Sequence, residues 1–363
     1  MKSVSIIKEH GQNEYRVVIV PNEVKEFLNK GIEVFVENSA GKNIGFSNSD
    51  YIDEGAKIVS REEAWHCSDF ILKYKPPIRE EYKYIRRGIH LGAIFHAEGN
   101  KELTSVLCKK NITAYSYEFF KTRDGLYPLA FVGGEIAGKL SVIYGAYHLQ
   151  RHLGGSGILL ADIIGVRKPK VIIIGYGNVG NAAIQVAKSL GLEVVVFGTN
   201  QEKMRRYNSS FGNDIKCLTF EKNIFAKEVL DADLVIGALL ISTYNTQPML
   251  TKDLVKKMKK GSMIIDVTCG YGIGYLPTFD KFTNPLKPVY EKYGVIHCKI
   301  DILPSTVPKT ASIAFSKQAA QYLARLGKAI YGKKPYTIGE CGKIVQNGKI
   351  VHPIVQSNLS YLK

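Results

Sequence analysis

The sequence lacks the features that mark several classes of protein. Its six cysteines are scattered and form no CxxC pair, so neither metal-ligand spacing nor a disulfide framework is indicated. No stretch approaches the ~18 uninterrupted apolar residues of a membrane helix. The N-terminal segment soon turns polar and has no signal-peptide cleavage site. We therefore expect a cytoplasmic globular protein without a metal site or membrane contact, whose cysteines are mostly small buried residues.

Acidic residues are few relative to basic ones. The chain has 49 Lys and Arg against 33 Asp and Glu, a formal net charge of +16. Such a balance can indicate nucleic-acid binding. Here, however, the cations are spread along the chain, and no basic stretch is interleaved with aromatic residues. We therefore expect no nucleic-acid partner, and a positive field that attracts an anionic substrate and a phosphorylated cofactor.

The length and the hydrophobic pattern predict two α/β domains. A chain of 363 residues corresponds to about two domains of ~150 residues each. Residues 1 to about 130 alternate short strands with helices, which indicates a parallel sheet. A helix from Glu135 to about Leu149 precedes a second and longer α/β run. The tail carries Asn347-Gly348 between β-branched pairs, a strong hairpin signal.

A glycine-rich turn in the second run predicts a dinucleotide site. Gly175-Tyr176-Gly177-Asn178-Val179-Gly180 follows the buried strand Val171–Ile174 and opens a helix from Asn178 to Leu190. In this context the first glycine makes the tight turn, the second lets the backbone approach a pyrophosphate, and the third allows close packing. The helix N-terminus then offers free N–H groups to the phosphates. We expect Gly175, Gly177, Asn178, Val179 and Gly180 to bind the cofactor.

The next strand bears on which dinucleotide is bound. An NAD site usually has an acidic residue at this strand end, which binds the ribose 2′-hydroxyl. Here the strand ends Val196-Phe197-Gly198-Thr199-Asn200, and Lys203, Arg205 and Arg206 follow. A cation can pair with a 2′-phosphate, so we predict NADP(H) in preference to NAD(H). The alternative is that these cations only face solvent.

The sequence resembles the alanine dehydrogenase/pyridine nucleotide transhydrogenase family over nearly its whole length. The resemblance rests on an ordered series of segments: Glu14-Tyr15-Arg16-Val17, Leu72–Pro76, Phe95-His96, Tyr117-Glu118, Gly134–Gly138, Val171–Gly180, Asp233–Leu240 and Lys259–Asp266. It implies two Rossmann-like domains with the active site in a cleft between them. The implied ranges are 1–130 and 305–363 for a discontinuous substrate domain and 131–304 for a central dinucleotide-binding domain.

The resemblance also implies roles for individual residues. Arg16 matches the arginine that holds the substrate carboxylate, and Lys75 matches a lysine that bonds the keto oxygen or carboxylate. His96 matches the general acid/base, a role that suits an unperturbed pKa near ~6.5. Tyr271 is expected to contact the substrate, and Gly198, Thr199, Asn200, Lys203, Arg205, Ala238 and Leu239 are expected to contact the cofactor. By analogy with relatives, we expect a homo-oligomer.

Departures from the family pattern leave the reaction open. Position 270 is glycine where alanine dehydrogenases carry an acid, and Gly133-Gly134 replaces a more polar pair. Residues 300–305 look more like saccharopine dehydrogenases, and N5-(carboxyethyl)ornithine synthase is a third relative. We expect an oxidoreductase acting on a carbon–nitrogen bond, by reductive amination of a 2-oxo acid or its reverse. The alternatives are an opine- or saccharopine-type secondary-amine dehydrogenase and a non-catalytic dinucleotide-binding protein.

Overall fold

The computed structural model describes residues 2–211, 215–239, 248–268, 276–300 and 302–361. The chain divides into two compact units. Unit 1 comprises Met1–Gly133 and Val307–Lys363, and unit 2 comprises Gly134–Thr306. The boundaries expected from the sequence, after residues 130 and 304, lie three and two residues before these divisions. Each unit is an α/β layer structure around its own parallel-dominated sheet.

Unit 1 contains an eight-stranded sheet that draws on both ends of the chain. The order across the sheet is β15-β14-β6-β5-β4-β1-β2-β3, in which β14 runs antiparallel to β6 and to β15, and the other pairs are parallel. The strands are β1 (Ser3–Ile6), β2 (Glu33–Glu37), β3 (Lys57–Val59), β4 (Phe70–Leu72), β5 (His90–Ala93), β6 (Thr113–Ser116), β14 (Lys343–Gln346) and β15 (Lys349–Ile350).

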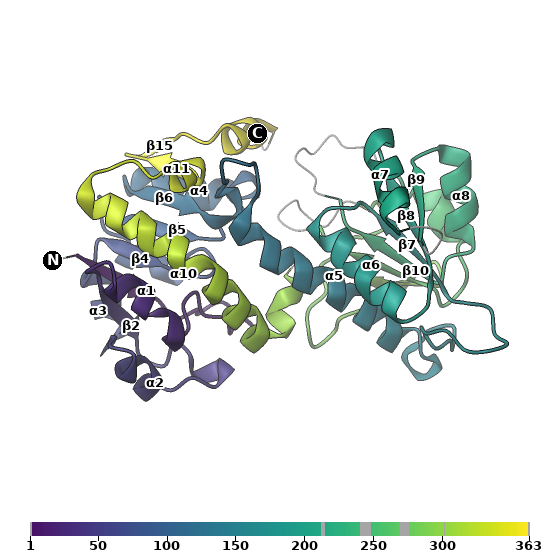
Figure 1. The fold of residues 1–363 in the computed structure, drawn as a ribbon, viewed down its shortest axis with the longest axis horizontal. Helices are drawn as coiled ribbons and strands as arrows, with labels where there is room; N and C mark the ends of the chain where they lie inside the picture. The colour runs from purple at the N-terminus through teal and green to yellow at the C-terminus, as the bar shows by residue number, and fades with distance from the viewer. Residues whose placement is uncertain (1, 212–214, 240–247, 269–275, 301, 362–363) are drawn as a thin grey trace. The chain divides into compact units, whose positions relative to one another are not determined.

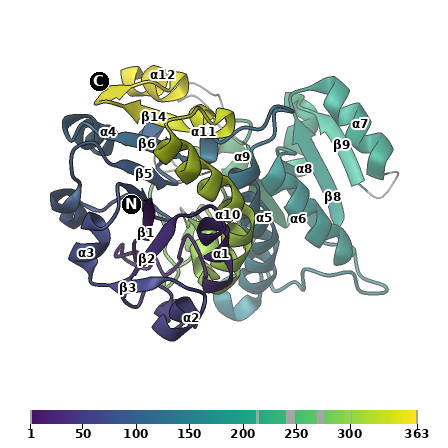
Figure 2. The same cartoon turned by 60° about the vertical axis from the view of Figure 1, so that its left-hand side comes forward.

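Helices cover both faces of this sheet. The helix α10 packs with α1 over one face, through buried residues such as Phe27, Phe315 and Leu323 (Figure 1). On the other face α3, α4 and α12 contribute Trp65, Leu107 and Val355 to a second core (Figure 2). The helices are α1 (Lys25–Leu28), α2 (Asn48–Asp53), α3 (Arg61–His66), α4 (Lys101–Lys109), α10 (Pro308–Gly332), α11 (Thr337–Cys341) and α12 (Pro353–Tyr361), with 3-10 helices η1 (Pro21–Glu23), η2 (Lys42–Ile44), η3 (Arg79–Tyr84), η4 (Ala97–Gly99) and η5 (Tyr117–Phe119).

Unit 2 contains a seven-stranded sheet with the order β12-β13-β11-β10-β7-β8-β9, in which only β12 is antiparallel to its neighbour. The strands are β7 (Lys170–Ile174), β8 (Glu193–Gly198), β9 (Ile215–Thr219), β10 (Leu234–Gly237), β11 (Met263–Asp266), β12 (Tyr290–Lys292) and β13 (Val295–Cys298). The helices are α6 (Asn178–Ser189), α7 (Gln201–Phe211), α8 (Lys222–Leu230) and α9 (Lys252–Lys257), with η6 (Arg151–Leu153) and η8 (Leu303–Thr306).

The hairpin predicted in the tail is confirmed. Strands β14 and β15 pair antiparallel with Gln346 opposite Lys349, so two residues form the turn. These residues, Asn347 and Gly348, have φ angles of 49° and 75°. Two successive positive φ angles define a type I′ turn, whose twist matches that of the strands it joins. The hairpin places β14 beside β6 and so extends the sheet of unit 1 (Figures 1 and 2).

The helix α5 (Pro128–His148) begins earlier than expected and is unusually apolar. By length and composition alone, it is the one helix in the described ranges that could cross a membrane. Its apolar run is interrupted by Glu135 and Lys139, in keeping with the expectation that no long uninterrupted apolar stretch occurs. These two side chains form an ion pair of 2.6 Å. In unit 2, α5 lies close against α6 at Gly138.

The expectation that most cysteines are buried is wrong for the described residues. Cys217 and Cys298 are buried, whereas Cys67 is exposed and Cys108 and Cys341 are half-buried. Cys67 follows the last turn of α3, and Cys108 lies near the end of α4. Burial of a small apolar side chain depends on which face of its element meets the core, which cysteine spacing alone does not reveal.

Two glycines on α5 should respond oppositely to alanine. A Cβ at Gly138 would lie 2.1 Å from the carbonyl oxygen of Val179, whereas a Cβ at Gly133 would meet nothing within 4 Å. Gly138→Ala should therefore lower the free energy of unfolding by about 1–3 kcal/mol through overpacking. Gly133→Ala should raise it by up to about 1 kcal/mol through helix propensity. Urea unfolding of both variants measures the two effects, and equal responses would contradict the close α5–α6 contact.

Candidate active site

The proposed substrate-side residues lie at the carboxyl ends of adjacent parallel strands in unit 1. The neighbouring strands β4 and β5 end at Leu72 and Ala93, and each is followed three residues later by Lys75 or His96. Ligands of open parallel sheets bind outside this edge of the strands. Arg16 lies in the segment between β1 and η1. The Arg16 guanidinium lies 4.1 Å above the ring of Tyr74, the residue before Lys75. Burial, together with the charges of Lys75 and Arg16, lowers the pKa of His96.

Arg16 is fixed in place by Glu14 and Tyr74. Its guanidinium is buried and donates from Nε and Nη2 to the Glu14 carboxylate, at 2.7 and 2.5 Å. The guanidinium also lies 4.1 Å above the ring of Tyr74. Burial alone would raise the pKa of Glu14, but the hydrogen bonds and charge of Arg16 hold it below its usual value. The Arg16 guanidinium has five N–H donors, and Glu14 occupies only one of its edges. The N–H groups on its other edges are therefore left for a ligand carboxylate.

The segment that carries Arg16 is also attached to α10. The backbone N–H of Val17 donates to Ser312 Oγ at 3.0 Å, and that of Val20 donates to Ser316 Oγ at 2.9 Å. Both serines are buried on a helix from the C-terminal part of the chain. These bonds satisfy amides that no strand partner reaches. The position of Arg16 therefore depends on residues nearly three hundred positions away, as the separations of 295 and 296 show.

The Lys75 segment is held by the buried carboxylate of Glu9. Glu9 Oε1 accepts the backbone N–H groups of Tyr74 and Lys75, at 2.7 and 3.2 Å. Its other oxygen lies 3.2 Å from Lys73 Nζ, which also contacts Glu81 at 3.1 Å. Burial, opposed by Lys73 and supported by Glu14 and Glu81, raises the pKa of Glu9 to about 7. Glu9 thus sets the positions of Lys75 and of the ring beneath Arg16.

His96 is held through its backbone by Glu118. The N–H groups of His96 and Phe95 donate to the two oxygens of this carboxylate, at 2.6 and 3.3 Å. His96 has a φ of 45°, a left-handed conformation that a histidine adopts at a cost. Its Nδ1 lies 4.0 Å from Glu118 Oε1, too far for a hydrogen bond. Burial, with Lys75 and Arg16, holds the pKa of His96 well below its usual value, so the imidazole is neutral at neutral pH.

Sequence reasoning missed four residues of this arrangement: Glu9, Glu14, Tyr74 and Glu118. Three of them are carboxylates, a residue type that is mostly exposed. Glu14 and Glu118 lie inside the segments that resemble the family, but nothing in a single sequence distinguishes a buried carboxylate from an exposed one. A usable signal was the spacing of Glu14 two residues before Arg16, because an acid this close can take one edge of the guanidinium.

In unit 2 the glycine-rich turn has the shape that a dinucleotide requires. Gly175 has a φ of 108°, and a Cβ there would lie 2.6 Å from the carbonyl oxygen of Ala238. A Cβ at Gly180 would lie 2.1 Å from the carbonyl oxygen of Gly175. Gly177 is exposed, and a Cβ there would meet nothing within 4 Å, so its backbone is open to a ligand. The three glycines therefore fit the turn, approach and packing roles of the motif.

The other expected cofactor residues surround this turn. Asn178 and Val179 form the first turn of α6, whose N-terminus offers donors to phosphate. The backbone of Leu239 lies against Gly175, where a Cβ would be 3.1 Å from its nitrogen. Gly134, on α5, approaches the same place, since its Cβ would be 3.0 Å from Asn178 Cβ. The residues present fit a bound dinucleotide.

The end of β8 carries no carboxylate. Gly198 is buried, and Thr199 and Asn200 are exposed. Asn200 Oδ1 accepts the N–H of Lys203 at 2.9 Å and so caps the start of α7. Lys203 and Arg205 are exposed on this helix. Arg206 is 2.5 Å from Glu202 and is engaged by it. Tyr271 and Gly270 lie outside the described residues, as does the substrate contact expected there.

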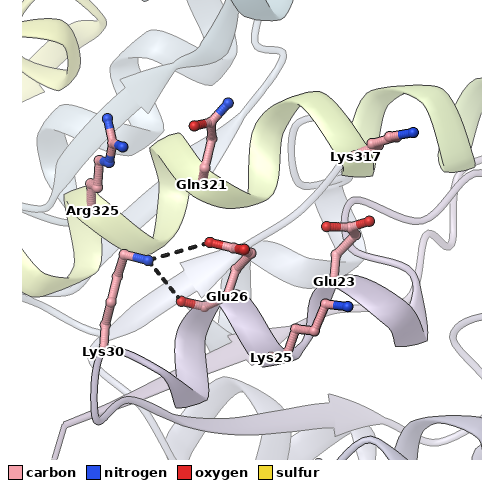
Figure 3. A pocket seen from close by; sticks show the side chains of 7 residues that line it. All are labelled: Glu23, Lys25, Glu26, Lys30, Lys317, Gln321 and Arg325. Atoms are coloured by element: carbon pink, nitrogen blue, oxygen red, sulfur yellow. Dashed lines mark hydrogen bonds and ion pairs between the residues drawn. The ribbon is translucent and has the colours of Figure 1, made fainter.

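A separate surface pocket of ≈ 390 Å³ lies beside α1 and α10 (Figure 3). Its lining mixes cations with carboxylates, and Lys30 is bonded to Glu26 at 3.3 Å. Its four cations outnumber its two carboxylates, and it includes none of the expected site residues. The lining residues are Glu23, Lys25, Glu26, Lys30, Lys317, Gln321 and Arg325.

The fold and the glycine turn define the chain as a two-unit α/β protein with a dinucleotide-binding unit. Family models for the N-terminal and C-terminal domains of alanine dehydrogenase/PNT match residues 5–132 and 141–353. The chain therefore belongs to the alanine dehydrogenase/PNT family, and it is an enzyme of the amino acid dehydrogenase class.

Individual relatives agree with this membership. The chain is 34% identical over 360 residues to an alanine dehydrogenase of Bacillus subtilis, which covers 99% of this chain and 95% of the relative. It is 32% identical to an alanine dehydrogenase of Methanococcus maripaludis, over 90% of this chain and 88% of the relative. A solved L-alanine dehydrogenase superposes with a TM-score of 0.90 at 33% identity, covering 99% of this chain and all of that one. A transhydrogenase from Sinorhizobium meliloti shares the fold, with a TM-score of 0.77 at 23% identity over 97% and 99% of the two chains.

Glu9→Gln should reduce the pH dependence of stability. The pKa of Glu9 rises from 4.5 to about 7 in the folded chain. Between these values the folded chain keeps a proton that the unfolded chain releases, so the free energy of unfolding falls as the pH rises. The slope from one such group reaches at most about 1.4 kcal/mol per pH unit. Urea unfolding from pH 4.5 to 8 should show a smaller fall for Glu9→Gln than for the wild type.

The matched control is Glu81→Gln, which removes the other carboxylate on Lys73 but not the acceptor of the Tyr74 and Lys75 amides. It should keep most of the pH dependence, because burial is the main cause of the raised pKa of Glu9. The assignment of this pH dependence to Glu9 would be contradicted if Glu9→Gln kept the wild-type slope of unfolding free energy against pH. It would also be contradicted if only Glu81→Gln lost that slope.

Proposed function

We propose that the protein is an NADP(H)-dependent oxidoreductase that acts on the carbon–nitrogen bond of an amino acid or imine, by reductive amination of a 2-oxo acid or its reverse. Family membership supports the class of reaction. The observation that carries the proposal is geometric: Lys75 and His96 follow the adjacent strands β4 and β5, and the Arg16 guanidinium lies 4.1 Å above the ring of Tyr74, the residue before Lys75. The two cations suit a small carboxylate, and the imidazole suits proton exchange with the oxygen or nitrogen on the adjacent carbon.

Arg16 is proposed to bind the substrate carboxylate. Its guanidinium is rigid, because Glu14 holds one edge and the ring of Tyr74 supports its face. A planar, permanently charged fork suits a carboxylate better than a flexible ammonium does. Lys75 is proposed to bond the keto oxygen or the same carboxylate, from a backbone position that Glu9 fixes.

His96 is proposed to be the general acid/base. Burial, Lys75 and Arg16 disfavour its protonated form, so the free enzyme presents a base. A bound carboxylate adds negative charge beside the two cations, which raises the pKa of His96 toward neutrality. The imidazole can then exchange a proton with the oxygen or nitrogen on the α-carbon as carbonyl, carbinolamine and imine interconvert. When bound, the nicotinamide supplies or accepts a hydride.

The preference for NADP(H) is proposed from the end of β8. No acidic side chain follows this strand at Gly198, Thr199 or Asn200, so a 2′-phosphate meets no repulsion there. Lys203 and Arg205 are exposed on the first turns of α7 and can pair with that phosphate. We also propose a small amino acid or 2-oxo acid as the substrate partner, cytoplasmic localisation from the sequence, and a homo-oligomer by analogy with relatives.

The first experiment identifies the nitrogen donor and the cofactor. The purified protein is mixed with NADPH or NADH, with pyruvate, glyoxylate or 2-oxoglutarate, and with ammonia, ornithine or lysine. Absorbance of the reduced nicotinamide is then followed. We expect faster oxidation of NADPH and activity with ammonia. Activity only with an amino acid donor would favour the opine-type reaction, and faster oxidation of NADH would overturn the cofactor preference.

Variants of the substrate-side residues separate binding from chemistry. His96→Asn should lower kcat by a factor of about 10²–10⁴, the usual contribution of a general acid/base. Arg16→Lys should mainly raise KM for the oxo acid, because the bidentate contact is lost. In the deamination direction, the acid limb of the pH profile of kcat/KM should lie below pH 6.5 in the wild type, since the pKa of His96 is lowered. An acid limb above 6.5, or full activity of His96→Asn, would contradict its role.

A further inference from the structure

The space beside Gly198, at the end of β8, is filled by the ring of Tyr176. A Cβ built on Gly198 would lie 2.3 Å from Cε1 and 2.7 Å from Cδ1 of this ring, and 3.0 Å from Cε of Met204. Gly198 has no unusual backbone angle, so conformation does not require glycine at this position. Glycine fits this position because the ring of Tyr176 occupies the volume that a side chain would enter.

Tyr176 is held in this position by two neighbours. Its ring packs against that of Tyr207, with centroids 5.3 Å apart and planes at 54°. Its backbone carbonyl oxygen accepts the Tyr207 hydroxyl at 3.1 Å and the Asn181 side-chain amide at 3.2 Å. The same amide donates to the Tyr207 hydroxyl at 2.8 Å. These contacts tie the glycine-rich turn, α6 and α7 together around the ring.

This position matters because of what it contacts in a dinucleotide site. In such folds the residue at the end of the second strand receives the adenosine ribose, and a carboxylate there binds the 2′-hydroxyl. Tyr176 brings a neutral aromatic ring to the same place. The ring cannot accept the paired hydrogen bonds that a carboxylate makes to a ribose, and it does not repel a phosphate.

We propose that Tyr176 is a specificity-determining residue for the cofactor: by filling the space beside Gly198 it excludes an acidic side chain and leaves the ribose to the cations of α7. The inference rests on the proposed NADP(H) preference for the direction of selectivity. The coupling between Tyr176 and Gly198 rests on the geometry alone. It follows that an acid introduced at position 198 can select NADH only after the ring has been removed.

A double-mutant cycle tests this inference. Dissociation constants for NADPH and NADH are measured from nicotinamide fluorescence, without turnover, for the wild type, Tyr176→Ala, Gly198→Asp and the double variant. Gly198→Asp alone should weaken both cofactors, because the new side chain and the ring compete for one space. In the double variant, the ratio of Kd for NADH to Kd for NADPH should fall at least about tenfold from its wild-type value. This corresponds to a change of about 1.4 kcal/mol in the relative binding free energy. Tyr176→Phe keeps the ring beside Gly198 and is the conservative control; its selectivity should stay within about twofold of the wild type.

A second cycle remains informative if Gly198→Asp does not fold. Gly198→Ala adds only the clashing Cβ, so it should lower the unfolding temperature of the wild type and have little effect in the Tyr176→Ala background. Equal losses in the two backgrounds would overturn the inference, as would a switch to NADH in Gly198→Asp with Tyr176 intact. A wild type that binds NADH more tightly would refute the NADP(H) preference, whereas non-additivity in the cycles would still support the coupling.

Discussion

Strands that end inside a protein leave backbone N–H groups that must find acceptors, and the arrangement of unit 1 depends on how β4 and β5 meet this requirement. Glu9 accepts the amides of the segment after β4, and Glu118 accepts those of the segment after β5. The strand order places β6, which precedes Glu118, beside β5, and β1, which precedes Glu9, beside β4. Two central strands thus deliver Lys75 and His96, and the two flanking strands deliver the carboxylates that hold them.

Burying these carboxylates is costly, and the structure compensates in different ways. Glu9 faces the buried ammonium of Lys73, which a second carboxylate, Glu81, also contacts. Glu118 relies mainly on backbone amides, and burial raises its pKa. Such arrangements do little for stability compared with well-packed apolar residues. Their value lies in fixing a left-handed histidine and a lysine at defined positions beside Arg16.

The sequence predicted the fold in outline and much of the site. Sequence patterns predicted the elements that depend on neighbouring residues alone. A β-branched run predicted β7, glycine spacing predicted the turn at Gly175, and Asn347-Gly348 predicted the hairpin. The start of α5 was misplaced, because its first turns lie in a segment with no clear periodicity. The partners of Arg16, Lys75 and His96 were not predicted, since Glu9 meets Tyr74 only across 65 residues of chain. Likewise, only the fold reveals that Tyr176 rests on Gly198.

The attachment of α10 to the segment of Arg16 has a consequence for the order in which the protein is made. A ribosome releases Arg16 early, but Ser312 and Ser316, which bind the backbone around it, emerge only after all of unit 2. Until then the first core of unit 1 lacks Phe315 and Leu323, and β6 lacks its neighbour β14. The inserted unit is a continuous stretch of chain and can complete its sheet first. The segment that carries Arg16 is therefore completed last, so that a truncated chain would carry a finished unit 2 beside an unfinished unit 1.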